Sequence, residues 1–167
     1  GASANAAEAA APCEITAIEP EPSFDLRALP NIRLVQMQVE HVPLEEFDKL
    51  EANDILFIDS SHTIRTGGDV VWEYLEIIPR LRAGVMVHCH DIFLPAEYPR
   101  AFVTGACTFW DEQYLFHAFL LFNRQFEVMW AGHYLHLNHR EMLGNAFNSY
   151  RKCPTPPSSF WLRRVAG

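Results

Sequence analysis

Short apolar runs recur along the chain and have the length and composition of β-strands. The run at 54–58 (DILFI) is continuously apolar, which predicts a strand covered on both faces. The other runs with strand character lie at 14–18 (EITAI), 32–37 (IRLVQM), 85–90 (VMVHCH), 126–130 (FEVMW) and 160–164 (FWLRR).

Apolar residues at helical spacing predict the clearest helix over 66–82. Thr66 is its expected N-cap, Pro79 is expected to tighten its last turn, and Gly84 is expected to end it. A second amphipathic helix is predicted over 110–122. The remaining predictions are short helices over 3–11 and 43–50, a long connection over 93–108 and an irregular segment over 131–158.

Strands that alternate with helices indicate βαβ units and a mostly parallel sheet, which is an α/β fold. The pattern contains no internal repeat and no interdomain linker. We therefore predict one domain over 1–167.

Charge and composition narrow the classes of partner. The chain of 167 residues has a net charge of −8, a pI of about 5.4 and no basic run, which argues against a nucleic-acid groove or an anionic membrane. No apolar run has the length of a membrane span, and the first residues lack the features of a secretory signal, so a cytoplasmic protein is the default expectation. The four cysteines form no CxxC pair and are expected to be reduced.

Acids and imidazoles follow four of the predicted strands. They are Glu19 after the first, Glu40 after the second, Asp59-Ser60-Ser61-His62 after the third and His88-Cys89-His90-Asp91 at the end of the fourth. Because ligands of open parallel sheets bind at the carboxyl ends of strands, these residues are the candidate site. The carboxylate of Glu19 could accept both hydroxyls of a ribose, or it could be a solvated acid before a proline-rich loop.

Asp59, His62, His90 and Asp91 form the stronger group. Oxygen and imidazole ligands at one edge of a sheet suit Mg²⁺, Mn²⁺ or Fe²⁺. His62 could act as a general base, since imidazole titrates near neutral pH. The competing interpretation is that the two acids cap helices and that the histidines are packed residues at the edge.

Other histidines and aromatic residues favour structural roles. His88 shares a strand face with His90 and is predicted to be a packed core residue. His133, His136 and His139 could bind a metal, but a structural or lid role is favoured. The aromatic residues that could line a substrate pocket, or pack in the core, are Tyr98, Trp110, Tyr114 and Phe116.

Three segments together resemble a known family. DILFIDSSH, RLRAGVMVHCHDIFLPAEYP and FWDEQYLFHAFLLFN resemble bacterial class I S-adenosylmethionine-dependent methyltransferases of the small-molecule, natural-product type. The similarity covers 14–130 and the closing FWLRR strand. It implies a Rossmann-like fold with helices on both faces of the sheet and an antiparallel C-terminal strand. It also implies methyl transfer from S-adenosylmethionine to an oxygen of a small molecule.

The resemblance assigns roles to individual residues. It places the adenosyl ribose on Glu19 and implies further cofactor contacts at Gly1, Ser3, Glu40 and Asp59. Metal-dependent sugar O-methyltransferases of this group carry metal-binding acids at the positions of Asp59, His90 and Asp91, and a histidine at the position of His62. His90 departs from the pattern, because that position is an acid in the family.

The start of the chain also departs from the pattern of this family. Gly1-Ala2-Ser3-Ala4-Asn5 looks like the tail of the family's glycine-rich turn, so the first strand of the family is expected to be missing. Such a strand would lie between those at 14–18 and 54–58, and its loss would leave two unpaired edges. Either the chain is a fragment or another element, such as a partner chain, fills the gap.

Two other functions compete with methyl transfer. One is a metal-dependent enzyme of another class, such as a hydrolase or a non-heme iron oxygenase. The other is a catalytically silent binding domain. The acceptor, the metal and the oligomeric state, including a homo-oligomer, stay open at this point.

Overall fold

The computed structural model describes residues 13–165. The predicted helix at 3–11 and the candidate residues Gly1 and Ser3 lie outside this range. The chain divides into two compact units, Gly1–Val42 and Pro43–Gly167.

The first unit contains a two-stranded parallel sheet. Strands β1 (Ile15–Ile18) and β2 (Ile32–Val35) pair from Ile15↔Ile32 to Ile18↔Val35. The short helix α2 (Phe24–Ala28), which the sequence pattern did not predict, begins at Ser23, whose side chain accepts a hydrogen bond from the Leu26 N–H. The 3-10 turn η1 (Val39–His41) follows β2.

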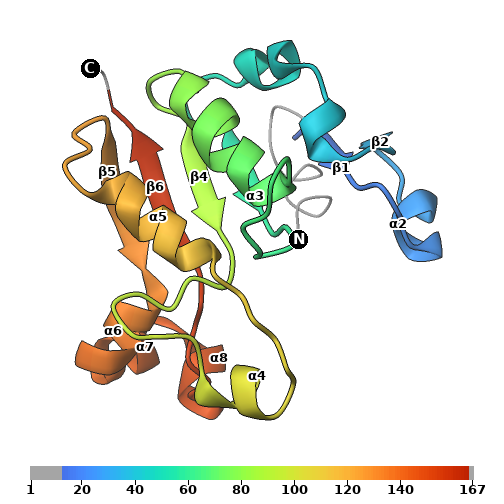
Figure 1. Ribbon diagram of the computed structural model, residues 1–167. Coiled ribbons are helices and arrows are strands. Elements are labelled where there is room, and N and C mark those ends of the chain that lie inside the picture. Colours follow the sequence, from blue (N-terminus) through green and yellow to red (C-terminus); the bar gives the residue numbers. More distant parts are fainter. Residues whose placement is uncertain (1–12, 166–167) are drawn as a thin grey trace. The chain divides into compact units, whose positions relative to one another are not determined.

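The second unit contains a four-stranded sheet in the order β3-β4-β6-β5 (Figure 1). Strands β3 (Ile55–Ile58) and β4 (Met86–Cys89) are parallel, and β6 (Phe160–Arg164) runs antiparallel between β4 and β5 (Phe126–Ala131). All six predicted strands are therefore present, and the antiparallel C-terminal strand is confirmed. Among the described residues no strand joins β1 to β3, and the missing first strand stays a prediction.

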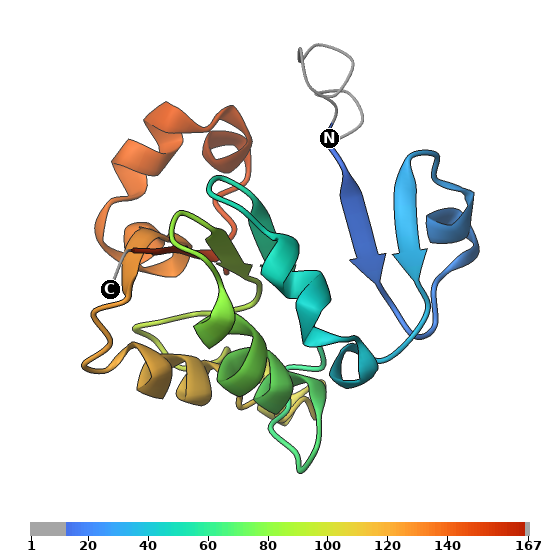
Figure 2. The ribbon, with the colours of Figure 1, turned by 90° about the horizontal axis from the view of Figure 1, so that it is seen from above.

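Two helical segments pack on one face of this sheet (Figures 1 and 2). One begins with α3 (Asp69–Trp72), and the other is α5 (Glu112–Leu120). Between the helices and the sheet lies a core of mostly apolar side chains: Ile58, Val70, Tyr74, Ile78, Leu81, Val85, Val87, Cys89, Ile92, Phe116, Phe126, Phe160 and Leu162. This arrangement of strands and helices is the predicted Rossmann-like α/β fold.

The first of these helical segments differs in detail from the predicted helix over 66–82. It starts at Asp69 after Gly68, so the expected N-cap Thr66 is wrong. After α3 it continues as a π-helical turn, η3 (Glu73–Ile77), and a 3-10 turn, η4 (Ile78–Arg80). Pro79 lies in the 3-10 turn, which confirms that it tightens the end of the helix. The helical segment stops at Arg80, so Gly84 does not end it as expected. Gly84 lies beyond that end, in a turn, with a φ of +91°.

The segment predicted to be irregular contains three short helices. They are α6 (Gly132–Asn138), α7 (Arg140–Ala146) and α8 (Asn148–Lys152). The prediction was wrong here because the segment has no side-chain N-caps and mixes aromatic, imidazole and polar residues without a regular apolar stripe. The remaining elements are the 3-10 helix η2 (Leu44–Lys49) and the short helix α4 (Arg100–Thr104), which lies inside the long connection before α5.

Burial along β3 alternates, unlike the continuous burial expected for DILFI. Ile58 is buried against the helices, whereas Ile55 and Phe57 are 49% and 55% exposed on the opposite face. The four cysteines are free thiols, as predicted. None of the helices in the described range is long and apolar enough to cross a membrane.

Candidate active site at the carboxyl ends of β3 and β4

Three of the predicted site residues converge where β3 and β4 end. The two strands are in register from Ile55↔Met86 to Ile58↔Cys89, so Asp59 and Asp91 emerge at the same edge of the sheet. The Nε2 atom of His62 lies 3.3 Å from Oδ1 of Asp59 and 3.9 Å from Oδ2 of Asp91. One ligand atom from each of the three residues lies within 4.8 Å of the others. We call Asp59, His62 and Asp91 the strand-end triad.

The loop that carries His62 is fixed by hydrogen bonds on both sides. Asp69, at the start of α3, accepts hydrogen bonds from the Ser61 N–H at 2.8 Å and from the Ser61 hydroxyl at 2.7 Å. The carbonyl of His62 accepts from the N–H groups of Asp111 and Glu112 at 3.0 and 3.2 Å. The loop therefore bridges the first turns of α3 and α5.

Two members of the strand-end triad have unusual backbone conformations. His62 has a φ of +57° and Asp91 a φ of +55°, both in the left-handed region that side-chain-bearing residues rarely adopt. Each such residue costs about 1–3 kcal/mol and persists where the surroundings hold it. For Asp91 those surroundings include Ser158, whose hydroxyl donates to Oδ1 at 2.7 Å.

Glu112 is the residue of the site that sequence reasoning missed. It is fully buried, and its Oε2 atom lies 2.6 Å from Nδ1 of His62. Its Oε1 atom accepts a hydrogen bond of 2.6 Å from the hydroxyl of Tyr74 on η3. The available signal was an acid on the same helical face as Phe116, four residues later, but the imidazole partner lies 50 residues earlier in the chain.

Burial and neighbouring charges act on the pKa of His62 in opposite directions. Burial alone would lower the pKa of His62, but the hydrogen bond and charge of Glu112, with the charges of Asp91 and Asp59, raise this pKa above its usual value. The aromatic ring of Trp110 lies 4.2 Å from the imidazole ring, centroid to centroid. His62 is thus enclosed by an aromatic ring, a buried carboxylate and the two strand-end carboxylates.

A second buried acid lies on η3, next to Tyr74. Glu73, the first residue of η3, is 7% exposed. Burial raises the pKa of Glu73 to about 8, and the charges of Glu112 and Asp69 act in the same direction. The hydroxyl of Ser60 interacts with this carboxyl group and acts in the opposite direction, lowering the pKa of Glu73.

His90 does not belong to the strand-end triad. Its Nε2 atom lies 3.8 Å from Oδ1 of Asp91, and its Nδ1 atom lies 3.4 Å from Nε2 of His88. The rings of both histidines lie against Phe57, on the sheet face opposite to Ile58. His88 is buried as predicted, and burial lowers its pKa to about 4.

The candidate residues Glu19 and Glu40 lie in the first unit. Glu19 follows β1, and one of its carboxylate oxygens accepts a hydrogen bond of 2.9 Å from the Glu21 N–H. Glu40 lies in η1, directly after β2. Both are half-buried and follow a strand, as the sequence predicted.

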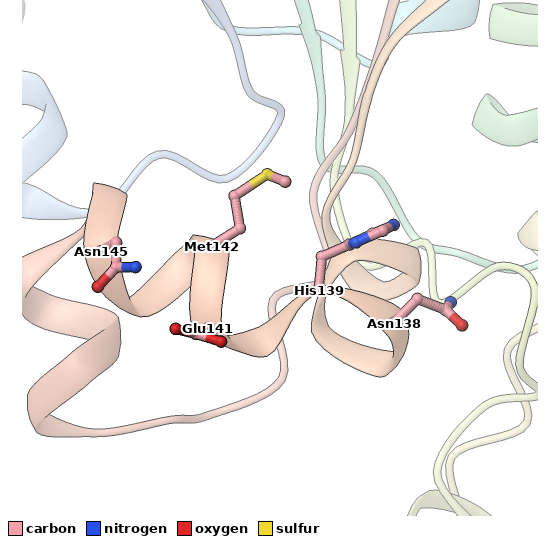
Figure 3. Close-up of a pocket in the computed structure, with 5 residues that line it drawn as sticks. All are labelled: Asn138, His139, Glu141, Met142 and Asn145. Atoms are coloured by element: carbon pink, nitrogen blue, oxygen red, sulfur yellow. The ribbon is translucent and has the colours of Figure 1, made fainter.

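In the histidine-rich segment, the contacts of His136 hold helices together. Nδ1 of His136 lies 2.7 Å from the hydroxyl of Tyr150 and thus ties α6 to α8. A hollow of about 460 Å³ is lined by Asn138, His139, Glu141, Met142 and Asn145 (Figure 3). Figure 3 shows these side chains pointing in several directions, and none of them belongs to the strand-end triad. This hollow therefore has no evident part in the chemistry.

The strand-end triad fits a divalent cation by its donor chemistry. Two carboxylates and an imidazole are ligands for Mg²⁺, Mn²⁺ and Fe²⁺, and their donor atoms already converge. Nε2 of His62 can serve as a ligand of such a cation or as a proton acceptor, and its one lone pair cannot do both at once.

Comparison with known proteins gives one family. A family model described as a methyltransferase domain matches residues 2–92, which is more than half of the 167 residues. The match runs from the first unit through β4 and includes the strand-end triad. Searches of curated proteins and of solved structures found no match. On the family match and the Rossmann-like fold, the chain belongs to the methyltransferase-domain family, a family of class I S-adenosylmethionine-dependent methyltransferases.

Proposed function

We propose that the protein transfers a methyl group from S-adenosylmethionine to a hydroxyl oxygen of a small molecule, with His62 as the general base. The observation that carries this proposal is the placement of His62, whose Nε2 atom lies beside two carboxylates at the strand ends while Nδ1 lies against Glu112. A neutral imidazole with its proton on Nδ1 leaves a lone pair on Nε2 that can accept a proton.

The reaction balances without a further reactant. The acceptor oxygen attacks the methyl carbon in line with the carbon–sulfur bond, and that bond breaks with its electron pair on sulfur. The products are the methyl ether and S-adenosylhomocysteine, and the hydroxyl proton passes to Nε2 of His62. Since the sulfonium group is already reactive, most of the catalytic work is orientation of the two reactants.

A divalent cation would be held by Asp59 and Asp91, with His90 beside Asp91. When bound, it would lower the pKa of the acceptor hydroxyl and orient it. The side chain of Asp59 is half exposed, so a cation from solvent can reach its carboxylate. The hydroxyl of Ser158 holds the carboxylate of Asp91 in place.

For the cofactor, the proposed contacts follow the family resemblance. They are Gly1, Ser3, Glu19, Glu40 and Asp59, with the Glu19 carboxylate on the ribose hydroxyls. The strongly acidic chain favours a small-molecule acceptor over nucleic acid or an anionic membrane. We also propose a cytoplasmic location.

The donor set of the strand-end triad favours one alternative. An imidazole and two carboxylates could serve a metal-dependent enzyme of another class, such as a non-heme iron oxygenase or a hydrolase. That alternative predicts tight metal binding without affinity for S-adenosylmethionine. A silent binding domain predicts affinity for neither.

The proposal is tested by His62→Ala, with His117→Ala, an exposed histidine on α5, as the matched control. Release of S-adenosylhomocysteine is measured with a panel of monosaccharides and phenols as acceptors. His62→Ala should abolish turnover while leaving cofactor affinity nearly unchanged, and the control should retain both. If cofactor affinity collapses in His62→Ala, or if turnover persists, His62 is not the base.

A further inference from the structure

We infer that the acceptor is a phenol, whose aromatic ring packs against Trp110 while its hydroxyl lies at the strand-end triad. The inference names the substrate class of the proposed function and rests on that function for the position of the reacting hydroxyl. Trp110 is then the residue that determines which acceptors fit.

The ring of Trp110 lies directly beside the triad. Its centroid is 4.2 Å from that of the His62 imidazole, at an interplanar angle of 44°, and the residue is only half-buried. The next residue, Asp111, donates its N–H to the His62 carbonyl at 3.0 Å, which fixes the main chain of this segment next to His62. An acceptor oxygen in contact with a triad atom lies roughly 3 Å from it, so the carbon atoms next to that oxygen come within reach of the Trp110 ring.

Other aromatic rings hold Trp110 in place. Phe102 contacts it edge-on at 5.2 Å between ring centroids and an interplanar angle of 87°, and Tyr98 does so at 6.0 Å and 74°. Phe109, directly before Trp110, and Ile64, on the loop that carries the triad histidine, are 67% and 38% exposed. Aromatic rings prefer offset-stacked or edge-on contacts with one another, and apolar side chains beside a reactive centre suit an apolar ligand. A further aromatic ring, that of the acceptor, fits this surface.

The polar side chains of this surface already bind backbone groups. The Tyr98 hydroxyl accepts from the N–H of Gln113 at 3.0 Å, and the Gln113 amide binds an N–H and a carbonyl of the loop before Trp110. Oδ1 of Asp111 accepts from the Ile64 N–H at 2.6 Å. A sugar acceptor would bring several hydroxyl groups, each of which needs a partner when it is taken from water. A phenol brings one hydroxyl and an apolar ring, which matches the residues present.

Charge and reactivity also favour a neutral phenol. The carboxylates of Asp59 and Asp91 and the net charge of −8 disfavour an acceptor that carries a carboxylate of its own. A phenol hydroxyl has a pKa of about 10, as in tyrosine, and loses its proton far more easily than an aliphatic alcohol does. The phenol oxygen forms a bond to the methyl carbon as the carbon–sulfur bond breaks with its electron pair on sulfur, and the hydroxyl proton passes to the base. The products are an aryl methyl ether and S-adenosylhomocysteine.

The test measures equilibrium binding to the wild-type protein by ligand-observed NMR titration, without turnover. The probe is 4-ethylphenol, and its saturated analogue 4-ethylcyclohexanol has the same hydroxyl and the same substituent but no aromatic ring. We expect 4-ethylphenol to bind about 2–10-fold more tightly, which is the factor that a pair of aromatic rings adds beyond the burial of apolar area.

Three variants assign this preference to Trp110. Trp110→Leu keeps an apolar side chain but removes the ring, so its preference for 4-ethylphenol should fall below about 2-fold. Trp110→Phe keeps an aromatic face and should keep the preference, which separates loss of the ring from loss of the fold. Phe122→Ala is the matched control, because Phe122 is fully exposed beyond the other end of α5, and it should bind both compounds as the wild type does.

Release of S-adenosylhomocysteine is the second readout, with 4-ethylphenol and methyl α-D-glucopyranoside as acceptors. We expect turnover of the phenol, with kcat/KM lowered in Trp110→Leu by about the same factor as binding. Equal binding of the two ring compounds to the wild type, a preference that survives in Trp110→Leu, or turnover of the glucoside alone would overturn the inference. Turnover of the glucoside alone would still support the proposed function. Conversely, the expected binding preference without transfer to any acceptor would defeat the proposed function and leave Trp110 as a phenol-binding residue.

Discussion

Replacement of the buried acid Glu73 by Gln should make the protein more stable at neutral and alkaline pH. Burial raises the pKa of Glu73 from 4.5 to about 8. Between these two pH values the carboxyl group of Glu73 is protonated in the folded protein and ionised in the unfolded chain. The folded state then binds more protons than the unfolded state between these two pKa values. Stability must therefore fall as the pH rises through this window, and Gln removes the effect.

The magnitude follows from the pKa difference. One pKa unit corresponds to about 1.4 kcal/mol, so ionisation of Glu73 lowers the free energy of unfolding by about 3 kcal/mol at pH 7 and by about 5 kcal/mol above pH 8. The burial of Glu73, at 7% exposed, supports use of the full difference without a correction for solvent screening. Gln has nearly the same shape and does not ionise.

The assay is urea unfolding of wild-type protein and Glu73→Gln across pH 5 to 9. The two proteins should have similar stability near pH 5 and diverge steadily towards pH 8. Glu76→Gln, an exposed acid on the same helical turn, is the matched control and should follow the wild type throughout. Parallel pH profiles for Glu73→Gln and wild type would refute the reasoning, because they would mean that folding leaves the ionisation of Glu73 unchanged.

Two further predictions concern the scaffold around the site. Gly84→Ala should lower the free energy of unfolding by about 1–3 kcal/mol in chemical denaturation, because Gly84 has a φ of +91° and an added Cβ would lie 2.5 Å from Cβ of Ala52; an unchanged midpoint would contradict this. Asp69→Asn should cost about 1–3 kcal/mol, because one of the two hydrogen bonds that Asp69 accepts from Ser61 is lost. Burial opposes ionisation of Asp69, but hydrogen bonds from Ser61 lower its pKa overall. The stability that ionised Asp69 contributes is therefore lost as the pH falls below the usual pKa range of aspartate. The Asp69→Asn variant should not lose stability in this acidic range.

The strands could be predicted from the sequence because each is a short apolar run. Their order along the chain also placed Asp59 and Asp91 at one edge, since parallel neighbours end together. The helices over 132–152 were missed because their apolar residues follow no regular stripe and because no side chain marks their starts. The start of α3 was misplaced because Asp69, and not Thr66, makes the hydrogen bonds that fix the preceding loop.

The site was predicted in outline and not in its contacts. Strand alternation turns His90 to the face of His88 and Phe57, whereas Asp91, with its left-handed backbone, turns towards His62. The sequence could name all three residues, but it could not show which side chains would meet. Glu112 was missed for a related reason, since the burial of an acid depends on a partner far away in the chain.

The central claim, that the chain is a methyltransferase using S-adenosylmethionine, is tested most directly by calorimetric titration of S-adenosylhomocysteine. The titration is performed with and without Mg²⁺, Mn²⁺ or Fe²⁺. We predict saturable binding of one S-adenosylhomocysteine per chain. Binding of a metal by the strand-end triad without any binding of S-adenosylhomocysteine would contradict the account and favour a metal-dependent enzyme of another class.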